Sequence, residues 1–253
     1  MFGGAAFPLL KDSLAHLLAI QVLTLRFGLS VILLFPLVVF KLKKSGLRLL
    51  AYGAVLGVFN FLSCQLEVWA MNAEPTSDAA FISAMCVVFV PFLMPILGLG
   101  RVRKMDCWAI VLAIIGMVVL GGLGSHIYSL TYLALFASAL CFAVYIVCLQ
   151  WVRQKTDQIF VLTFYQLLTI FLLAWGLSGG AIPWHQMDRL TIFAIFWCAL
   201  LATCFGFSAQ IYFQRFTTPT QTGLIFSLDP WFATFIAYFF NGEPLYLHTV
   251  LGG

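Results

Sequence analysis

The sequence predicts an all-α fold, a polytopic membrane helical bundle. Hydrophobic residues make up 63% of the 253 positions and charged residues only 9%, whereas ordinary soluble domains are about 25% charged. Apolar runs recur along the whole chain, and a helix of about 20 such residues crosses the roughly 30 Å hydrocarbon core of a bilayer. Barrel strands would instead appear as alternating segments of about 10 residues. The composition therefore excludes a soluble domain and favours membrane-spanning helices.

Eight apolar runs read as complete membrane spans. They cover residues 17–40, 47–71, 79–99, 107–122, 128–151, 160–177, 191–213 and 223–240. Residues 2–10 and 245–253 resemble parts of two further helices. The predicted fold is therefore a bundle of ten helices with truncated first and tenth helices.

The positions of the basic residues predict the orientation of the bundle. If the first helix runs outward, ten of the 13 basic residues fall at the ends of the even-numbered spans: Lys41, Lys43, Lys44, Arg48, Arg101, Arg103, Lys104, Arg153, Lys155 and Arg215. The opposite side holds Lys11 and Arg189, and Arg26 lies within a span. Because cytoplasmic loops are rich in Lys and Arg, both termini of the complete fold are predicted to be cytoplasmic.

The two halves of the chain resemble each other. Residues match at a nearly constant offset: Gly57 with Ala202, Gln65 with Gln210, Pro75-Thr76 with Pro219-Thr220, and Ser83 with Ser227. We therefore expect two five-helix repeats, residues 1–125 and 126–253. An odd number of helices in each repeat places the second repeat upside down relative to the first, and inverted repeats are typical of secondary transporters.

Several short motifs occur in a family-specific order. They are Phe2-Gly3 with Phe7-Pro8 and Lys11, Arg26-Phe27, residues 79–91, Ser227-Leu228-Asp229-Pro230, and Asn241-Gly242-Glu243-Pro244-Leu245. Together they resemble the EamA-type transporters of the drug/metabolite transporter superfamily, over almost the entire chain. The resemblance implies a secondary transporter, a permease or exporter, in the bacterial inner membrane. It also implies a central cavity between the two repeats where a small polar metabolite, such as an amino acid or nucleoside, binds.

Two charged residues within apolar spans are candidate site residues. Asp229 precedes Pro230, and a carboxylate at the centre of a membrane helix costs roughly 2.5–3.5 kcal/mol on insertion scales. Asp229 stands where the EamA family usually has glutamate, and its predicted role is to bind a cationic group, to carry a proton or to pair with Arg26. Arg26 is either a ligand for an anionic substrate or the partner of Asp229.

Polar and aromatic side chains supply the other candidates. Gln65 and Gln210 are predicted either to contact a polar substrate or to hydrogen-bond between helices. Tyr145, Trp69 and Tyr212 either line an aromatic cavity or anchor their helices at the membrane interface.

Small residues at four-residue spacing predict where helices approach each other closely. Gly53 and Gly57 form a GxxxG pattern, and Ala202 with Gly206 repeats it in the eighth span. Such patterns let two helix backbones come into contact.

An enzyme is the main alternative class. Residues 176–179 read Gly-Leu-Ser-Gly, as in intramembrane serine proteases, but no histidine occupies an obvious second catalytic position, and a helix-terminating turn is the better interpretation. The chain contains no HExxH motif and no nucleotide-binding glycine loop, so we expect no cofactor and no metal. The predicted partners are the small polar metabolite and the lipid bilayer, with no nucleic acid. Proton or ion coupling, a homodimer, and a channel or assembly role stay open.

Overall fold

The computed structural model describes residues 17–42, 45–74, 76–100, 130–180 and 189–226, with the separate positions 108, 111, 115, 187, 228 and 238–239. Every regular element in this part of the chain is helical, and six stretches are long and apolar enough to cross a membrane. The polytopic helical bundle is thus confirmed. The arrangement of ten helices in two repeats stays a prediction, because both terminal helices and most of the fifth and ninth spans lie outside the described residues.

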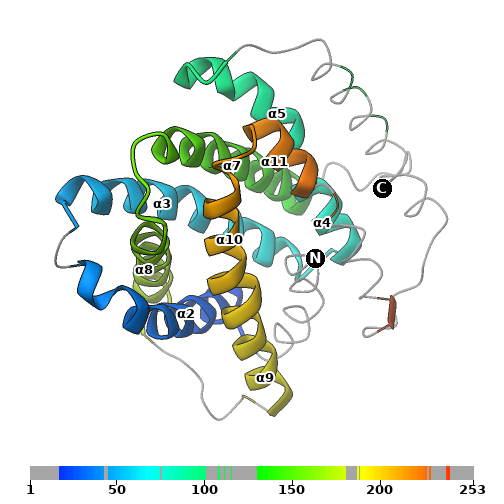
Figure 1. The fold of residues 1–253 in the computed structure, drawn as a ribbon. Coiled ribbons are helices and arrows are strands. Elements are labelled where there is room, and N and C mark those ends of the chain that lie inside the picture. The colour runs from blue at the N-terminus through cyan, green and yellow to red at the C-terminus, as the bar shows by residue number, and fades with distance from the viewer. Residues whose placement is uncertain are drawn as a thin grey trace.

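The helices follow the predicted spans closely (Figure 1). In chain order they are α2 (Ala19–Leu42), α3 (Leu47–Ala70), α4 (Thr76–Ala84), α5 (Cys86–Leu93), the 3-10 turn η1 (Met94–Leu97), α7 (Leu130–Arg153), α8 (Ile159–Leu177), α9 (Arg189–Trp197), the π-helical segment η4 (Cys198–Phe205), α10 (Gly206–Phe213) and α11 (Pro219–Phe226). The fourth predicted span is interrupted after Ala84, and it ends in η1, where Pro95 cannot donate a helical hydrogen bond. The eighth runs without a break through α9, η4 and α10.

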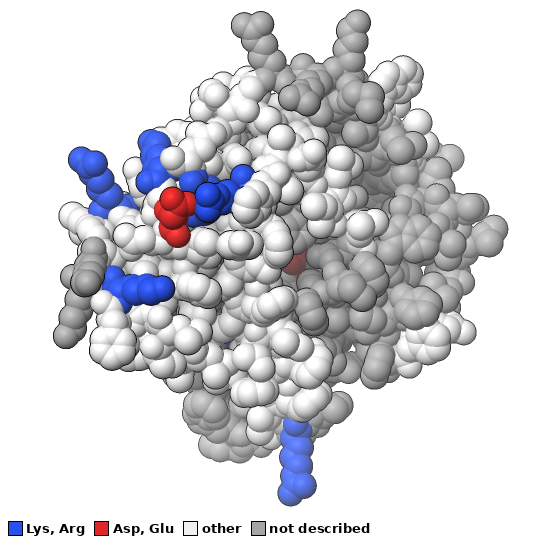
Figure 2. All heavy atoms as spheres, in the orientation of Figure 1, with Lys and Arg blue, Asp and Glu red and all other residues white. Residues whose placement is uncertain are grey.

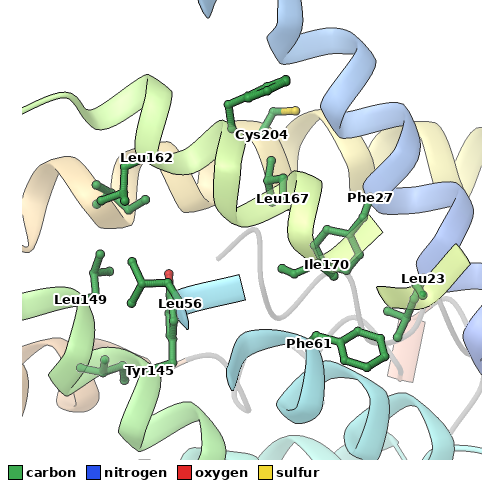
Figure 3. Packing of buried hydrophobic residues seen from close by; sticks show 14 of the residues in the cluster. Leu23, Phe27, Leu56, Phe61, Tyr145, Leu149, Leu162, Leu167, Ile170 and Cys204 are labelled. Atoms are coloured by element: carbon green, nitrogen blue, oxygen red, sulfur yellow. The ribbon is translucent and has the colours of Figure 1, made fainter. Parts of the chain in front are cut away.

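The helices α2, α3, α7 and α8 form the centre of the bundle. α2 packs along α8, and α3 packs along both α7 and α8, while α5 covers α7 and η4 crosses α2. Figure 3 shows side chains from these helices pointing toward one another: Leu23 and Phe27 of α2, Leu56 and Phe61 of α3, Tyr145 and Leu149 of α7, and Leu162, Leu167 and Ile170 of α8. The same helices carry exposed apolar side chains on their outer faces, for example Ile32, Leu133 and Leu172. Such faces suit a lipid environment, in which apolar surface needs no covering.

The GxxxG pattern of α3 places this helix directly against α8. A Cβ added at Gly53 would lie 2.4 Å from Tyr165 Cβ, and one added at Gly57 would lie 2.6 Å from Thr169 Cβ. The predicted close approach is therefore confirmed for α3. Gly206 differs, because the one atom found within 4 Å of an added Cβ belongs to Leu201, in the η4 segment of the same span.

Three helix connections meet at one end of the bundle. The Ser45 hydroxyl, between α2 and α3, lies 2.6 Å from Tyr165 Oη near the start of α8. Asp157, between α7 and α8, lies 3.8 Å from Nη1 of Arg215, which follows α10. A second basic side chain approaches the same carboxylate, with Arg153 Nη2 at 3.6 Å from Asp157 Oδ1. The ends of α2, α7 and α10 therefore lie together.

We call this the basic end, defined by Lys41, Arg48, Arg153, Lys155 and Arg215. Figure 2 shows basic side chains gathered near one acidic patch in one region of the visible face, with a single basic side chain projecting far from them. α8 leads away from the basic end, and the next helix, α9, begins at the exposed Arg189.

The Gly-Leu-Ser-Gly segment terminates a helix, as its sequence predicts. α8 ends at Leu177, and Ser178 caps it with a backbone N–H bond to Ala174 O. Gly179 and Gly180 then adopt φ angles of 64° and 73°, a left-handed conformation that glycine adopts without the strain of a side chain. The Ser178 hydroxyl donates to the Trp175 carbonyl, which is a local contact of the turn.

Candidate functional site

The contact between α3 and α8 places a glutamine in the centre of the bundle. A Cβ at Gly57 would lie 2.8 Å from the Gln166 carbonyl oxygen, so only glycine lets α8 come this close. The side chain of Gln166 is fully buried. Sequence reasoning had assigned it no role, although a polar amide in the middle of an apolar span is a signal that could have found it.

Gln166 belongs to a hydrogen-bonded group that we call the Tyr145 network, defined as Tyr145, Gln166 and Gln210. Gln166 Nε2 donates to Tyr145 Oη at 3.2 Å. Tyr145 Oη in turn lies 3.5 Å from Gln210 Oε1, at the outer limit of hydrogen-bonding distance. The network joins α7, α8 and α10, and Tyr145 at its centre is fully buried.

Both glutamines of the network keep a buried atom that no partner satisfies in the structure, namely Gln166 Oε1 and Gln210 Nε2. Two amide side chains of α3 also have a buried atom without a hydrogen-bond partner, Asn60 Nδ2 and Gln65 Oε1. An unsatisfied buried polar group costs about 1–3 kcal/mol, and each such group in a native protein calls for an explanation. A bound polar molecule or water that uses these donors and acceptors in some state of the protein would supply one.

Aromatic rings flank the Tyr145 network. Phe142 stacks on Tyr145 with ring centroids 5.5 Å apart, and Phe207 of α10 meets the Tyr145 ring edge to face at 6.4 Å. Phe226 of α11 contacts Phe142 at 5.3 Å. A few polar groups surrounded by aromatic and apolar side chains are typical of sites that bind small molecules.

Asn60 lies on the α3 side of this region. Its Oδ1 accepts a weak hydrogen bond from Cys64 Sγ at 3.7 Å. Sequence reasoning had not singled out Asn60, which is fully buried in the middle of α3.

The structure brings two of the predicted site residues together and leaves two others apart from them. Tyr145 and Gln210 are brought together in the Tyr145 network. Arg26 is buried and donates from Nε to Thr203 Oγ1 at 2.7 Å, and Gln65 is half-buried; no described hydrogen bond links either residue to the network.

The remaining predicted residues lie elsewhere. Trp69 is 41% exposed and Tyr212 is 45% exposed, and Tyr212 packs edge to face against Phe213 and Phe216 rather than against the network. Both positions fit the interface-anchor alternative. Asp229 lies outside the described residues, so its pairing with Arg26 stays a prediction.

Comparison with known proteins identifies the family. The EamA-like transporter family matches residues 1–122 and 129–253. The chain belongs to this family. This EamA-like transporter is also similar, at 21% identity over 230 residues, to an uncharacterized transporter of Archaeoglobus fulgidus, with 91% of this chain and 71% of the relative covered.

The fold is also found among solved structures. One crystal structure, described only as that of a protein, matches 99% of this chain and 91% of its own chain with a TM-score of 0.73 and 14% identity. At this identity the likeness concerns the fold alone. Family and relative together make this protein a multi-pass membrane transporter.

The described residues show no assembled metal site. No group of three His, Cys, Asp or Glu side chains in the described ranges lies close enough to hold a metal ion. The chemistry available at the Tyr145 network is that of neutral donors and acceptors, which suits reversible binding of a polar solute.

Proposed function

We propose that this EamA-like transporter is a secondary carrier of a small polar metabolite, such as an amino acid or a nucleoside. The observation that carries the proposal is the pair of buried, unsatisfied amide atoms in the Tyr145 network, Gln166 Oε1 and Gln210 Nε2. A carrier must bind its substrate and also release it, so a site whose polar atoms lack permanent protein partners suits this function. The flanking aromatic rings would give the substrate an apolar surface to lie against.

Alternating access between two inverted repeats is the proposed mechanism. α3 of the first predicted repeat packs on α7 and α8 of the second, so the Tyr145 network and Asn60 lie where the two repeats would meet. α3 begins at the basic end, whereas α10, which ends the corresponding span of the second repeat, finishes there. Opposite directions of equivalent spans are what inversion requires.

Counterflow into proteoliposomes tests the carrier function. Vesicles containing purified protein are preloaded with unlabelled L-leucine, L-threonine or uridine and then given the radiolabelled solute outside. We expect at least one solute to show saturable accumulation that depends on preloading. Linear, unsaturable flux would indicate a channel, and chemical conversion of the solute without accumulation would indicate an enzyme.

We further propose that the basic end faces the cytoplasm, in agreement with the positive-inside rule. In a variant that lacks native cysteines, we expect an impermeant maleimide added to intact cells to label Arg189→Cys and not Lys155→Cys. Both parent residues are exposed, so accessibility to the reagent depends on the side of the membrane. Labelling of Lys155→Cys from outside would reverse the proposed orientation.

Asp229 is proposed to handle substrate or a coupling proton. We then expect Asp229→Asn to fold nearly normally, yet to lose counterflow or its dependence on pH. If Asp229 only pairs with Arg26, Asp229→Asn should destabilise the protein, and Arg26→Leu combined with Asp229→Leu should recover both folding and transport. A well-folded Asp229→Asn protein with the wild-type rate and pH profile would contradict a functional role.

A further inference from the structure

The eighth span contains a π-helical segment in its middle. In η4 the hydrogen bonds reach one residue further than in an α-helix, as when the Gly206 N–H donates to Leu201 O. π-helices account for well under 1% of residues in proteins and are frequently found at functional sites. Neither apolar periodicity nor the transport mechanism accounts for its presence here.

Contacts from α2 surround η4. Arg26 Nε donates to Thr203 Oγ1 at 2.7 Å. The Ser30 hydroxyl, one turn further along α2, lies 2.7 Å from the Arg26 carbonyl oxygen of its own helix and 3.1 Å from the Ala199 carbonyl oxygen of η4, so the two carbonyls share its one proton. Cys204 Sγ donates to the Ser30 carbonyl at 3.3 Å. These residues are all buried, so α2 fixes η4 at both of its turns.

The hydrogen bond of the Thr203 side chain has the spacing of a π-helix. Its hydroxyl accepts from Arg26 and donates to Cys198 O at 2.9 Å, five residues earlier. Thr24 and Thr163, which lie in α-helices, instead donate to carbonyls four residues earlier. A threonine hydroxyl has one proton to donate, and Thr203 uses it at the spacing that characterises a π-helix.

The form of η4 sets the position of the helix that follows it. Gln210 lies in α10, and Ser208 of the same helix has a buried hydroxyl without a partner in the structure. If η4 became α-helical, α10 would turn relative to α9 by one residue position, which is about 100°. Such a turn would carry Gln210 Oε1 away from Tyr145 Oη.

We propose that Arg26, Ser30 and Thr203 are positioning residues that hold η4 in its π form and thereby set Gln210 against Tyr145. α2 belongs to the first predicted repeat and η4 to the second. These contacts therefore join the two repeats next to α10, which carries Gln210. The inference rests on the proposed transport function and extends it, because it assigns Arg26 a role that acts through Gln210.

The test uses a spectroscopic probe that needs no substrate. The full-length protein is labelled with 3-fluorotyrosine in detergent micelles, and the ¹⁹F resonance of Tyr145 is assigned by its absence from Tyr145→Phe. Gln210→Ala gives the shift that marks loss of the Gln210 contact. We expect Thr203→Val and the milder Ser30→Ala to shift the Tyr145 resonance in the same direction, whereas Thr203→Ser, which keeps the hydroxyl, restores the wild-type position.

A double substitution separates positioning from general structural damage. Thr203→Val should add no further shift in a Gln210→Ala protein, because both changes remove the same contact. Leu200→Ala, at an exposed position of η4, serves as the matched control and should leave the resonance unchanged. An unchanged Tyr145 resonance in both Thr203→Val and Ser30→Ala, or shifts that add to that of Gln210→Ala, would overturn the inference.

The same variants keep this inference separate from the proposed function. If wild-type protein shows no counterflow of L-leucine, L-threonine or uridine, the transport proposal loses its support, while the fluorine shifts still decide whether η4 positions Gln210. If counterflow is present while the Tyr145 resonance is unchanged in both Thr203→Val and Ser30→Ala, transport stands and the positioning role fails.

Discussion

A Gly57→Val protein should lose much of its folded population in detergent. An added Cβ would lie 2.6 Å from Thr169 Cβ and 2.8 Å from the Gln166 carbonyl oxygen, and the carbonyl belongs to a helix backbone that cannot turn aside. Overpacking of this kind typically costs about 1–3 kcal/mol. We expect a lower melting temperature in a size-exclusion thermostability assay, together with reduced counterflow.

Gly176→Val provides the matched control. Gly176 lies in α8, is exposed, and has no atom within 4 Å of an added Cβ. The same substitution there should leave stability close to that of wild type, because no neighbour has to move. Equal losses at Gly57 and Gly176 would show that the contact between α3 and α8 is looser than the structure indicates.

The GxxxG pattern illustrates how much of the fold could be predicted from sequence. Gly53 and Gly57 correctly indicated a close approach of α3 to another helix, but not that this helix would be α8. The choice of partner depends on which face of each span points inward. In a membrane protein both the inner and the lipid-facing sides of a helix are apolar, so periodicity distinguishes them poorly.

The π-helical segment could not be predicted for a related reason. Thr203 and Ser30 are ordinary small polar residues in sequence, and only their meeting in three dimensions stabilises the wider turn. The interruption of the fourth span between Ala84 and Cys86 likewise has no clear signal in its apolar run, although Pro95 marks the later change to a 3-10 turn.

Two of the predicted site residues lie in contact in the structure. Gln210 was selected by its match to Gln65 in the other half of the chain, and Tyr145 by its aromatic character, and these two do meet. Gln166 completes the network. The matching stretch of the first half contains Arg26 and no glutamine, so the internal repeat gave no reason to select Gln166. Trp69 and Tyr212 were selected for the same aromatic character and are partly exposed, so their role as cavity residues stays a prediction.

Gln166→Leu should strongly reduce transport without destabilising the protein. Leucine is close to glutamine in size, and it removes both the donor to Tyr145 Oη and the buried, unsatisfied Oε1. Removing an unsatisfied buried group recovers up to about 1–3 kcal/mol, which offsets the lost hydrogen bond. We therefore expect an unchanged or higher melting temperature. Counterflow should fall at least about tenfold, equivalent to 1.4 kcal/mol of substrate binding.

Thr163→Val, in the same helix, is the control for this prediction. Thr163 is also fully buried, but its hydroxyl donates to the Ile159 carbonyl of its own helix. Its removal should therefore change neither stability nor counterflow appreciably. Natural binding sites commonly sacrifice stability for function, so a variant that is inactive and equally or more stable is the expected signature of a substrate-binding residue. If Gln166→Leu instead lost folding and transport together, Gln166 would be a structural link between α7 and α8. If Gln166→Leu transported at the wild-type rate, Gln166 would not be a substrate-binding residue.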